Sequence, residues 1–175
     1  RLKPLKKLER AEVRIKQRIA AFTFIATVLF GPAVAIGGTE RTTLIAELLR
    51  EVNIQRENNG KQPLRLNSRL TAAAQKHAKN MSENNFFGHL SPDGRGVTER
   101  VTKEGYLWRA IAENIGAGLS SPKFTVTAWM NSREHRDNLL NGEFNEVGIG
   151  YFQPLQNETK PRYSHYWVIV FGGRS

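Results

Sequence analysis

The chain of 175 residues contains no cysteine. This absence excludes disulfides, thiolate metal ligands and a cysteine nucleophile. Any chemistry must therefore use the four histidines, the carboxylates, the hydroxyl groups or the backbone. An oxidising compartment stays possible, because disulfides are optional in exported proteins. The length allows one domain with a buried core, plus an appendage.

The chain is also poor in acidic residues, with 16 Asp and Glu against 26 Lys and Arg, for a net charge of +10. Much of the excess lies in residues 1–35, which hold eight basic and two acidic side chains. The other 140 residues hold 18 basic and 14 acidic side chains. That is an ordinary basic surface and not a stripe for a phosphate backbone, so we expect no nucleic-acid partner.

Residues 19–30 form an uncharged, apolar segment behind this basic flank. Gly31-Pro32 interrupts the segment, and Ala33-Val34-Ala35 provides the small residues of a cleavage site. This order predicts a signal peptide over residues 1–35, with cleavage after Ala35. The alternative is an uncleaved N-terminal membrane anchor, which would be the only part of the chain at a membrane. Both interpretations predict a protein that is secreted or held in the cell envelope, periplasmic or extracellular.

Residues 36–41 are predicted to be a linker, followed by a folded domain over residues 42–175. The first helix should begin at Thr42 or Thr43 and end near Gly60. A second helix should begin at Asn67 or Ser68, because apolar residues then recur at helical spacing. Its stripe consists of Leu70, Ala73, Ala74, His77, Ala78 and Met81. His77 within this stripe is either a buried, hydrogen-bonded histidine or a ligand.

The second half of the domain is predicted to contain helices and then strands. A short helix is expected over residues 98–103, and Ser121-Pro122 should cap a helix that runs through Met130. Residues 147–153 and 163–171 are rich in β-branched and aromatic residues, which favours strands joined by the polar stretch 154–161. Helices first and strands last predict the α+β class with an antiparallel sheet.

Three polar residues stand in motif-like settings: His89, Glu113 and His135. Two imidazoles and a carboxylate that meet could hold a divalent metal, zinc for example, or share protons. Sequence spacing does not show whether they meet. His135-Arg136-Asp137 is similar to a kinase catalytic loop, but the asparagine expected five residues after Asp137 is Gly142. The chain is also too short for a kinase.

Several segments, in order, resemble the CAP superfamily of cysteine-rich secretory proteins, antigen 5 and pathogenesis-related 1 proteins, in its bacterial SCP-like form. The matching segments are the loop Phe86–Gly94, Arg100, Gly105-Tyr106, Ala112-Glu113-Asn114-Ile115, the run Trp129–Leu140, and Phe144–Gly150 with Tyr166–Phe171.

This resemblance implies an α-β-α sandwich with a three- to four-stranded antiparallel sheet between helical layers. It also implies a cleft where His89, Glu113 and His135 meet, supported by Asn114, Ser132 and Glu134. Ser132 stands where many eukaryotic members have a second glutamate, so the usual set of two histidines and two glutamates is incomplete.

Three functions follow as hypotheses. The first is a non-enzymatic module that binds an extracellular or envelope ligand or partner through this cleft, with or without a divalent metal. The second is a metal-dependent, peptidase-like hydrolase that uses His89, His135 and Glu113. The third is binding of lipid or cell-wall glycan beside the sheet. As an alternative to all three, the cluster could be a structural hydrogen-bond network. Trp108, in a predicted loop, is a further candidate for stacking on a ligand.

Overall fold

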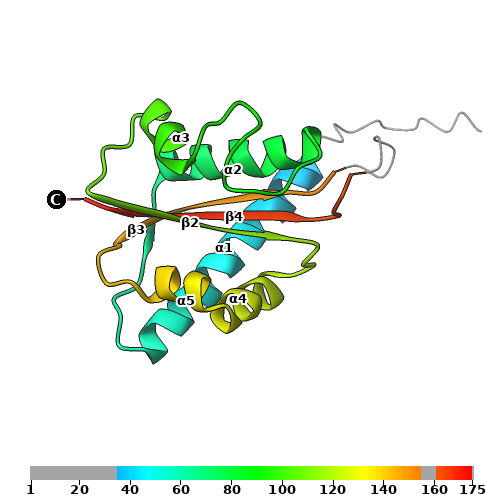
Figure 1. Cartoon of the computed structure of the whole chain (residues 1–175). Coiled ribbons are helices and arrows are strands. Elements are labelled where there is room, and N and C mark those ends of the chain that lie inside the picture. The colour runs from blue at the N-terminus through cyan, green and yellow to red at the C-terminus, as the bar shows by residue number, and fades with distance from the viewer. Residues whose placement is uncertain (1–34, 155–160, 175) are drawn as a thin grey trace, which may run out of the picture. The chain divides into compact units, whose positions relative to one another are not determined.

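The computed structural model describes residues 35–154 and 161–174, so the signal peptide or anchor expected over residues 1–35 lies outside the described residues except for Ala35. Figure 1 shows a sheet between two helical layers. In chain order the elements are α1 (Ala35–Asn58), β1 (Arg65–Leu66), α2 (Ser68–Glu83), α3 (Val97–Lys103), β2 (Ala110–Ala117), α4 (Pro122–Asn131), α5 (Arg133–Leu140), β3 (Glu146–Phe152) and β4 (Tyr166–Gly173).

Local capping explains where two of the helices begin. Asn67 precedes α2 and accepts hydrogen bonds from the backbone N–H groups of Arg69 and Leu70. Ser121 precedes α4 and accepts one from the N–H of Phe124, with Pro122 at the first helical position. Both starts agree with the sequence, because these side chains satisfy N–H groups that the first helical turn leaves free.

The first helix departs from the prediction. α1 begins at Ala35, so residues 36–41, which were expected to be a linker, are helical, and neither Thr42 nor Thr43 caps the helix. Instead, the hydroxyl of Thr42 donates to the carbonyl of Gly38, and that of Thr43 donates to the carbonyl of Thr39. Hydroxyl groups that donate to the carbonyl four residues earlier are typical of threonines inside a helix, not of threonines that cap one.

The sheet has the order β1-β3-β4-β2. β4 pairs antiparallel with β3, as predicted, and also with β2, whereas the two-residue β1 pairs parallel with β3, so the sheet is mixed. Two of its strands, β1 and β2, were not predicted. The α+β class and the α-β-α sandwich are confirmed: α2 and α3 cover one face, and α1, α4 and α5 cover the other (Figure 1).

Alternation along β4 divides the core into two halves. Trp167, Ile169 and Phe171 pack toward α1, α4 and α5. Tyr166, Val168 and Val170 pack toward α2 and α3. All six are at most 1% exposed, as expected for a central strand that is covered on both faces.

Two glycines of β3 bring α2 unusually close to the sheet. A Cβ atom on Gly148 would lie 2.0 Å from the carbonyl carbon of Leu70, and one on Gly150 would lie 2.3 Å from that of Ala74. The alternating pattern of β3 therefore places glycine on the α2 face and Val147, Ile149 and Tyr151 on the other. Since no side chain separates the two backbones, α2 packs directly on the strand.

Arg56, near the end of α1, is fully buried and has no carboxylate partner among the described residues. Its guanidinium donates to four backbone carbonyls, those of Gln62, Leu139, Asn141 and Phe144, at 2.7 to 3.2 Å. Burial lowers the pKa of Arg56. This side chain joins the end of α1 to the end of α5 and to the segment that leads into β3.

Across the described residues, no helix combines the length and apolar character needed to cross a membrane.

Candidate functional site at the edge of the sheet

β2 lies at one edge of the sheet, and its alternation sends two polar side chains to opposite faces. Glu113 pairs in register with Val170, so it faces α2 and α3. Asn114 pairs with Ile169 and faces α4 and α5. Both residues are buried, which requires that each finds polar partners in its own layer.

The carboxylate of Glu113 is held at both oxygens. Oε1 accepts a hydrogen bond of 2.9 Å from Nδ1 of His89, and Oε2 accepts one of 2.7 Å from Nη2 of Arg100. The side chain is only 2% exposed. The guanidinium of Arg100 compensates the charge of Glu113, and each oxygen accepts one hydrogen bond. Glu113 therefore holds Arg100 and His89 in place.

Arg100, on α3, also holds the loop that carries His89. Its Nη1 donates to the backbone carbonyls of His89 and Arg95, at 2.9 Å each. The imidazole of His89 is thus positioned by the Glu113 carboxylate at Nδ1 and by Arg100 at the backbone. Since a carboxylate accepts at Nδ1, that nitrogen carries a proton, and Nε2 of a neutral ring is a free acceptor. The His89 side chain is 54% exposed.

His77 is buried beneath this pair. Its Nε2 lies 3.0 Å from the carbonyl of Gly88 and 4.0 Å from Oε1 of Glu113. Burial lowers the pKa of His77, and the negative charge of Glu113 only partly opposes this. The interpretation of His77 as a buried, hydrogen-bonded histidine of the helical stripe is therefore confirmed.

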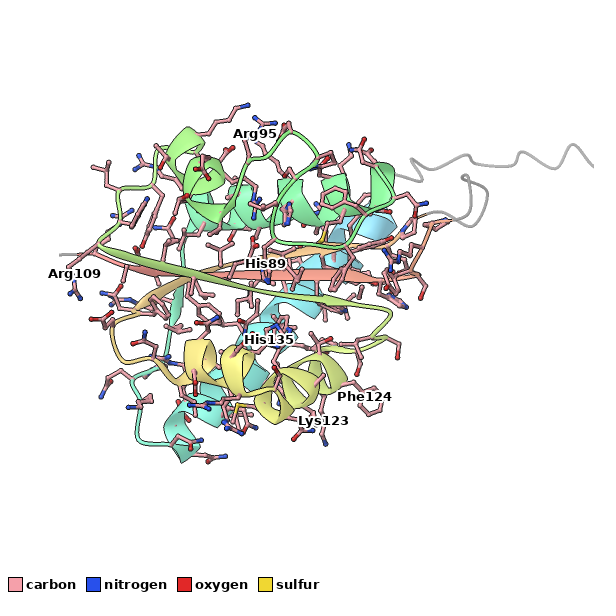
Figure 2. The ribbon with its side chains drawn as sticks, in the orientation of Figure 1. His89, Arg95, Arg109, Lys123, Phe124 and His135 are labelled. Carbon is pink, nitrogen blue, oxygen red and sulfur yellow. The ribbon has the colours of Figure 1, made fainter. Side chains whose placement is uncertain are left out.

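His135 reaches the same edge from the opposite layer. Asn114 Nδ2 donates to the backbone carbonyl of His135, and Asn138 Nδ2 donates to Oδ1 of Asn114, at 2.9 Å each. The imidazole itself has no hydrogen-bond partner among the described residues. Burial lowers the pKa of His135, the nearby charge of His89 lowers it further, and Glu134 raises it. Figure 2 shows His89 and His135 on either side of β2.

The predicted residues therefore come together only in part. His89 and Glu113 bond directly, and Asn114 supports His135 through its backbone. Glu134 is exposed, and Ser132, between α4 and α5, makes no side-chain cap hydrogen bond within the described part of the chain. The pairing of Arg100 with Glu113 was not predicted. The one hint in the sequence was the position of Arg100, in the helix that follows the loop of His89.

The donor set does not fit a metal site with Glu113 as a ligand. Arg100 and His89 already occupy both carboxylate oxygens. Within residues 35–154 and 161–174, no three His, Asp or Glu side chains are grouped so that they could hold a metal ion. A divalent cation on the two imidazoles, His89 and His135, stays a prediction.

The aromatic residues divide between core and surface. Trp129, Trp167 and Tyr166 are at most 2% exposed, and Trp129 Nε1 donates to the carbonyl of Ile115, which ties α4 to β2. Trp108 is 41% exposed. Its stacking on a ligand stays a prediction.

An α-β-α sandwich with a histidine-glutamate cluster at its edge strand defines a class of domain, and comparisons with known proteins agree. The family model described as "Cysteine-rich secretory protein family", CAP, matches residues 49–171, more than half of the chain. The chain belongs to the CAP family.

Two curated relatives come from Bacillus subtilis (strain 168). The uncharacterized protein YkwD is 34% identical over 101 residues, which are 58% of this chain and 39% of YkwD. The uncharacterized membrane protein YlbC is 30% identical over 111 residues, which are 63% of this chain and 32% of YlbC. The matched part thus spans well under half the length of each relative.

Solved structures show the same fold. An extracellular protein containing a SCP domain from Bacillus anthracis has a TM-score of 0.67 and 25% identity, covering 77% of this chain and 41% of that one. An outer surface protein from Borrelia burgdorferi has a TM-score of 0.68 and 22% identity, covering 76% of this chain and 94% of that one, and shows the fold alone. The structural neighbours are thus extracellular or surface proteins.

Proposed function

We propose that this chain is a non-enzymatic binding module that acts outside the cytoplasm and takes its ligand at the β2 edge. The observation that supports the proposal is the hydrogen bonding and burial of the Glu113 carboxylate. Its two oxygens accept hydrogen bonds from Arg100 and His89, and its side chain is 2% exposed, which favours a positioning role over that of a general base or metal ligand. The carboxylate instead positions a histidine that faces solvent.

The imidazoles of His89 and His135 are the proposed contact groups. His89 offers Nε2 as a hydrogen-bond acceptor, and the ring of His135 has both nitrogens free of partners among the described residues. Figure 2 shows the two histidines on either side of β2, and the charge of His89 adds to the effect of burial in lowering the pKa of His135, which supports a ligand that contacts both. Support for a place outside the cytoplasm comes from the basic, apolar leader and from the extracellular relative of Bacillus anthracis.

Peptidoglycan is the probe with which we test the proposal, because it is the main polymer of the compartment that the leader predicts. The purified chain is sedimented with insoluble peptidoglycan and, separately, with liposomes. We expect binding to peptidoglycan, lost in the double variant His89→Ala/His135→Ala and kept in Lys123→Ala, an exposed change on α4. Wild type that stays in the supernatant, or a double variant that sediments equally, would reject the proposed contact groups.

A parallel assay addresses the hydrolase alternative. Peptide, ester and peptidoglycan substrates are incubated with the chain, with and without zinc. We expect no turnover above that of the double variant His89→Ala/His135→Ala. Hydrolysis that disappears in this variant would establish an enzyme and overturn the non-enzymatic assignment.

A further inference from the structure

The loop between α3 and β2 carries two exposed apolar side chains, with Leu107 80% exposed and Trp108 41% exposed. They line a hollow of about 280 Å³ together with Arg69 and Arg174, and the exposed Arg109 follows Trp108 in the chain. We call this region the Trp108 surface and define it by Arg69, Leu107, Trp108, Arg109 and Arg174. In Figure 2, Arg109 marks this end of the molecule, far from His135. The Trp108 surface is therefore separate from the β2 edge site.

Hydrogen bonds fix the loop on both sides of its two apolar residues. On one side, Tyr106 is buried, and its hydroxyl donates to Oε2 of Glu146 at 2.8 Å. On the other side, the backbone N–H of Arg109 donates to the carbonyl of Gly173 at 2.9 Å. The apolar side chains between these points are thus held at the surface by ordered neighbours.

The charge of the Trp108 surface is mainly positive. Arg174 pairs with Glu146 at 3.1 Å, and Arg109 lies 3.9 Å from Glu143. Arg69 has no carboxylate within 4.0 Å among the described residues. Three arginines against two glutamates leave one positive charge uncompensated. Exposed apolar side chains beside such a charge favour a partner that is both apolar and anionic.

We propose that the Trp108 surface docks on an anionic phospholipid bilayer. Leu107 and Trp108 enter the boundary between headgroups and acyl chains, where tryptophan is enriched in membrane-bound proteins. The three arginines lie at the level of the lipid phosphates, with their apolar stems along the bilayer. This contact goes beyond the expectation that only an uncleaved leader would lie at a membrane.

The shape of the surface favours a bilayer over a small anion. The hollow has several times the volume of roughly 30 Å³ that a water molecule occupies in the liquid, so it has room for one headgroup phosphate between Arg69 and Arg174. A soluble anion seated there would leave Leu107 in water. A bilayer covers this protruding side chain as well.

Tryptophan fluorescence of the full chain tests the proposal. Residues 1–35 contain no tryptophan, and Trp129 and Trp167 are at most 2% exposed, so Trp108 is the tryptophan that can meet lipid. The vesicles consist of phosphatidylcholine with brominated acyl chains, which quench indole on contact, alone or mixed with phosphatidylglycerol. We expect quenching on the anionic vesicles, and a ratio of docked to undocked domain about tenfold lower on the neutral ones. Trp108→Phe should remove this quenching.

Two matched pairs of variants locate the contact. Leu107→Ala should lower the docked ratio about tenfold, whereas Phe124→Ala, at a 62% exposed position of α4, should not change it. Arg69→Gln should lower the ratio about fivefold, whereas Lys123→Gln on α4 should not change it. All four side chains are exposed, so these changes leave the core intact.

Unquenched Trp108 on anionic vesicles, or quenching that Leu107→Ala and Arg69→Gln leave unchanged, would overturn the proposal. A shift of Trp108 emission caused by soluble glycerol phosphate, without quenching by vesicles, would indicate a soluble ligand instead. A shift that grows with protein concentration in the absence of vesicles would indicate a second copy of the chain, and would overturn the proposal too. His89 and His135 are intact in every variant, so the peptidoglycan test is decided separately.

Discussion

Arg100 donates from Nη2 to Oε2 of Glu113 across 2.7 Å, and the two side chains are only 10% and 2% exposed. Glu113 also orients His89 toward the β2 edge, because its other oxygen accepts a hydrogen bond of 2.9 Å from Nδ1 of that ring. Arg100 in turn donates to the backbone carbonyl of His89. The pair therefore holds His89 at both its ring and its backbone.

Breaking this pair should destabilise the fold strongly. Glu113→Gln leaves the guanidinium of Arg100 buried without a counter-charge, and we expect a loss of about 3–5 kcal/mol in the free energy of unfolding. Urea denaturation followed by circular dichroism measures it. The matched control is Arg133→Met, which removes an exposed pair with Asp137 at 3.9 Å and should cost no more than about 1 kcal/mol. Equal, small losses in both variants would show that the buried pair does not hold the site.

Acid should destabilise the protein through His77. Burial lowers its pKa in the folded state, with Arg100 and His89 adding to the effect and Glu113 and the Gly88 carbonyl opposing it. The unfolded chain then binds more protons than the folded one once pH falls below the ordinary histidine pKa of about 6.5. The contribution of His77 to the free energy of unfolding should thus be fully present above that pH. It should decline as the pH falls toward the pKa of His77 in the folded state.

His135 and His165 also have lowered pKa values, chiefly through burial, and contribute in the same direction. We therefore expect His77→Gln to be less stable at neutral pH but to lose less on acidification. Urea midpoints measured across this pH range test the sign. A wild-type urea midpoint that rises on acidification would contradict this role of His77. So would a His77→Gln midpoint that depends on pH as strongly as that of the wild type.

Gly148 should not tolerate a side chain. Its Cβ would lie 2.0 Å from backbone of α2, which cannot move aside without shifting the helix. We expect Gly148→Ala to cost about 1–3 kcal/mol or more, the range for overpacked cores. The control is Gly142, where an added Cβ would meet no atom of the described residues within 4 Å. A thermal melt that shows equal stability for Gly148→Ala and Gly142→Ala would mean that α2 does not pack directly on β3.

Arg56 should be needed for its four carbonyl bonds. Arg56→Met keeps much of the volume but leaves buried carbonyls without donors, each costing about 1–3 kcal/mol. Arg50→Met, on the same helix with a 65% exposed side chain, is the control and should be nearly neutral. Chemical denaturation compares the two. Similar stability for both variants would argue that water, not Arg56, serves these carbonyls.

Local signals predicted the parts of the fold that depend on neighbouring residues. Asn67 and Ser121 cap helices because their side chains bond to N–H groups two or three residues away. The apolar stripe of α2 could also be predicted, because it depends only on residues three and four positions apart in the same helix. β2 was missed because its residues alternate only weakly in hydrophobicity and obtain their strand geometry from pairing with β4, far along the chain.

The site was predictable in its members but not in its contacts. The resemblance pointed to His89, Glu113 and His135, yet the sequence could not show that Glu113 bonds His89 and Arg100 while Asn114 holds the backbone of His135. Those partners lie in different layers, and only the register of β2 against β4 decides which side chain faces which layer.

His89 and His135 are the proposed ligand contacts of the edge site, and Glu113 only positions His89. Nuclear magnetic resonance of the histidine ring nitrogens, recorded during titration with soluble peptidoglycan fragments, tests this most directly. His165, whose Nδ1 lies 2.8 Å from the hydroxyl of Tyr151, serves as the internal reference. We expect the signals of His89 and His135 to shift together and saturate, while those of His165 stay in place. Signals of His89 and His135 that do not move, or a shift confined to His165, would contradict the proposed role of the two imidazoles.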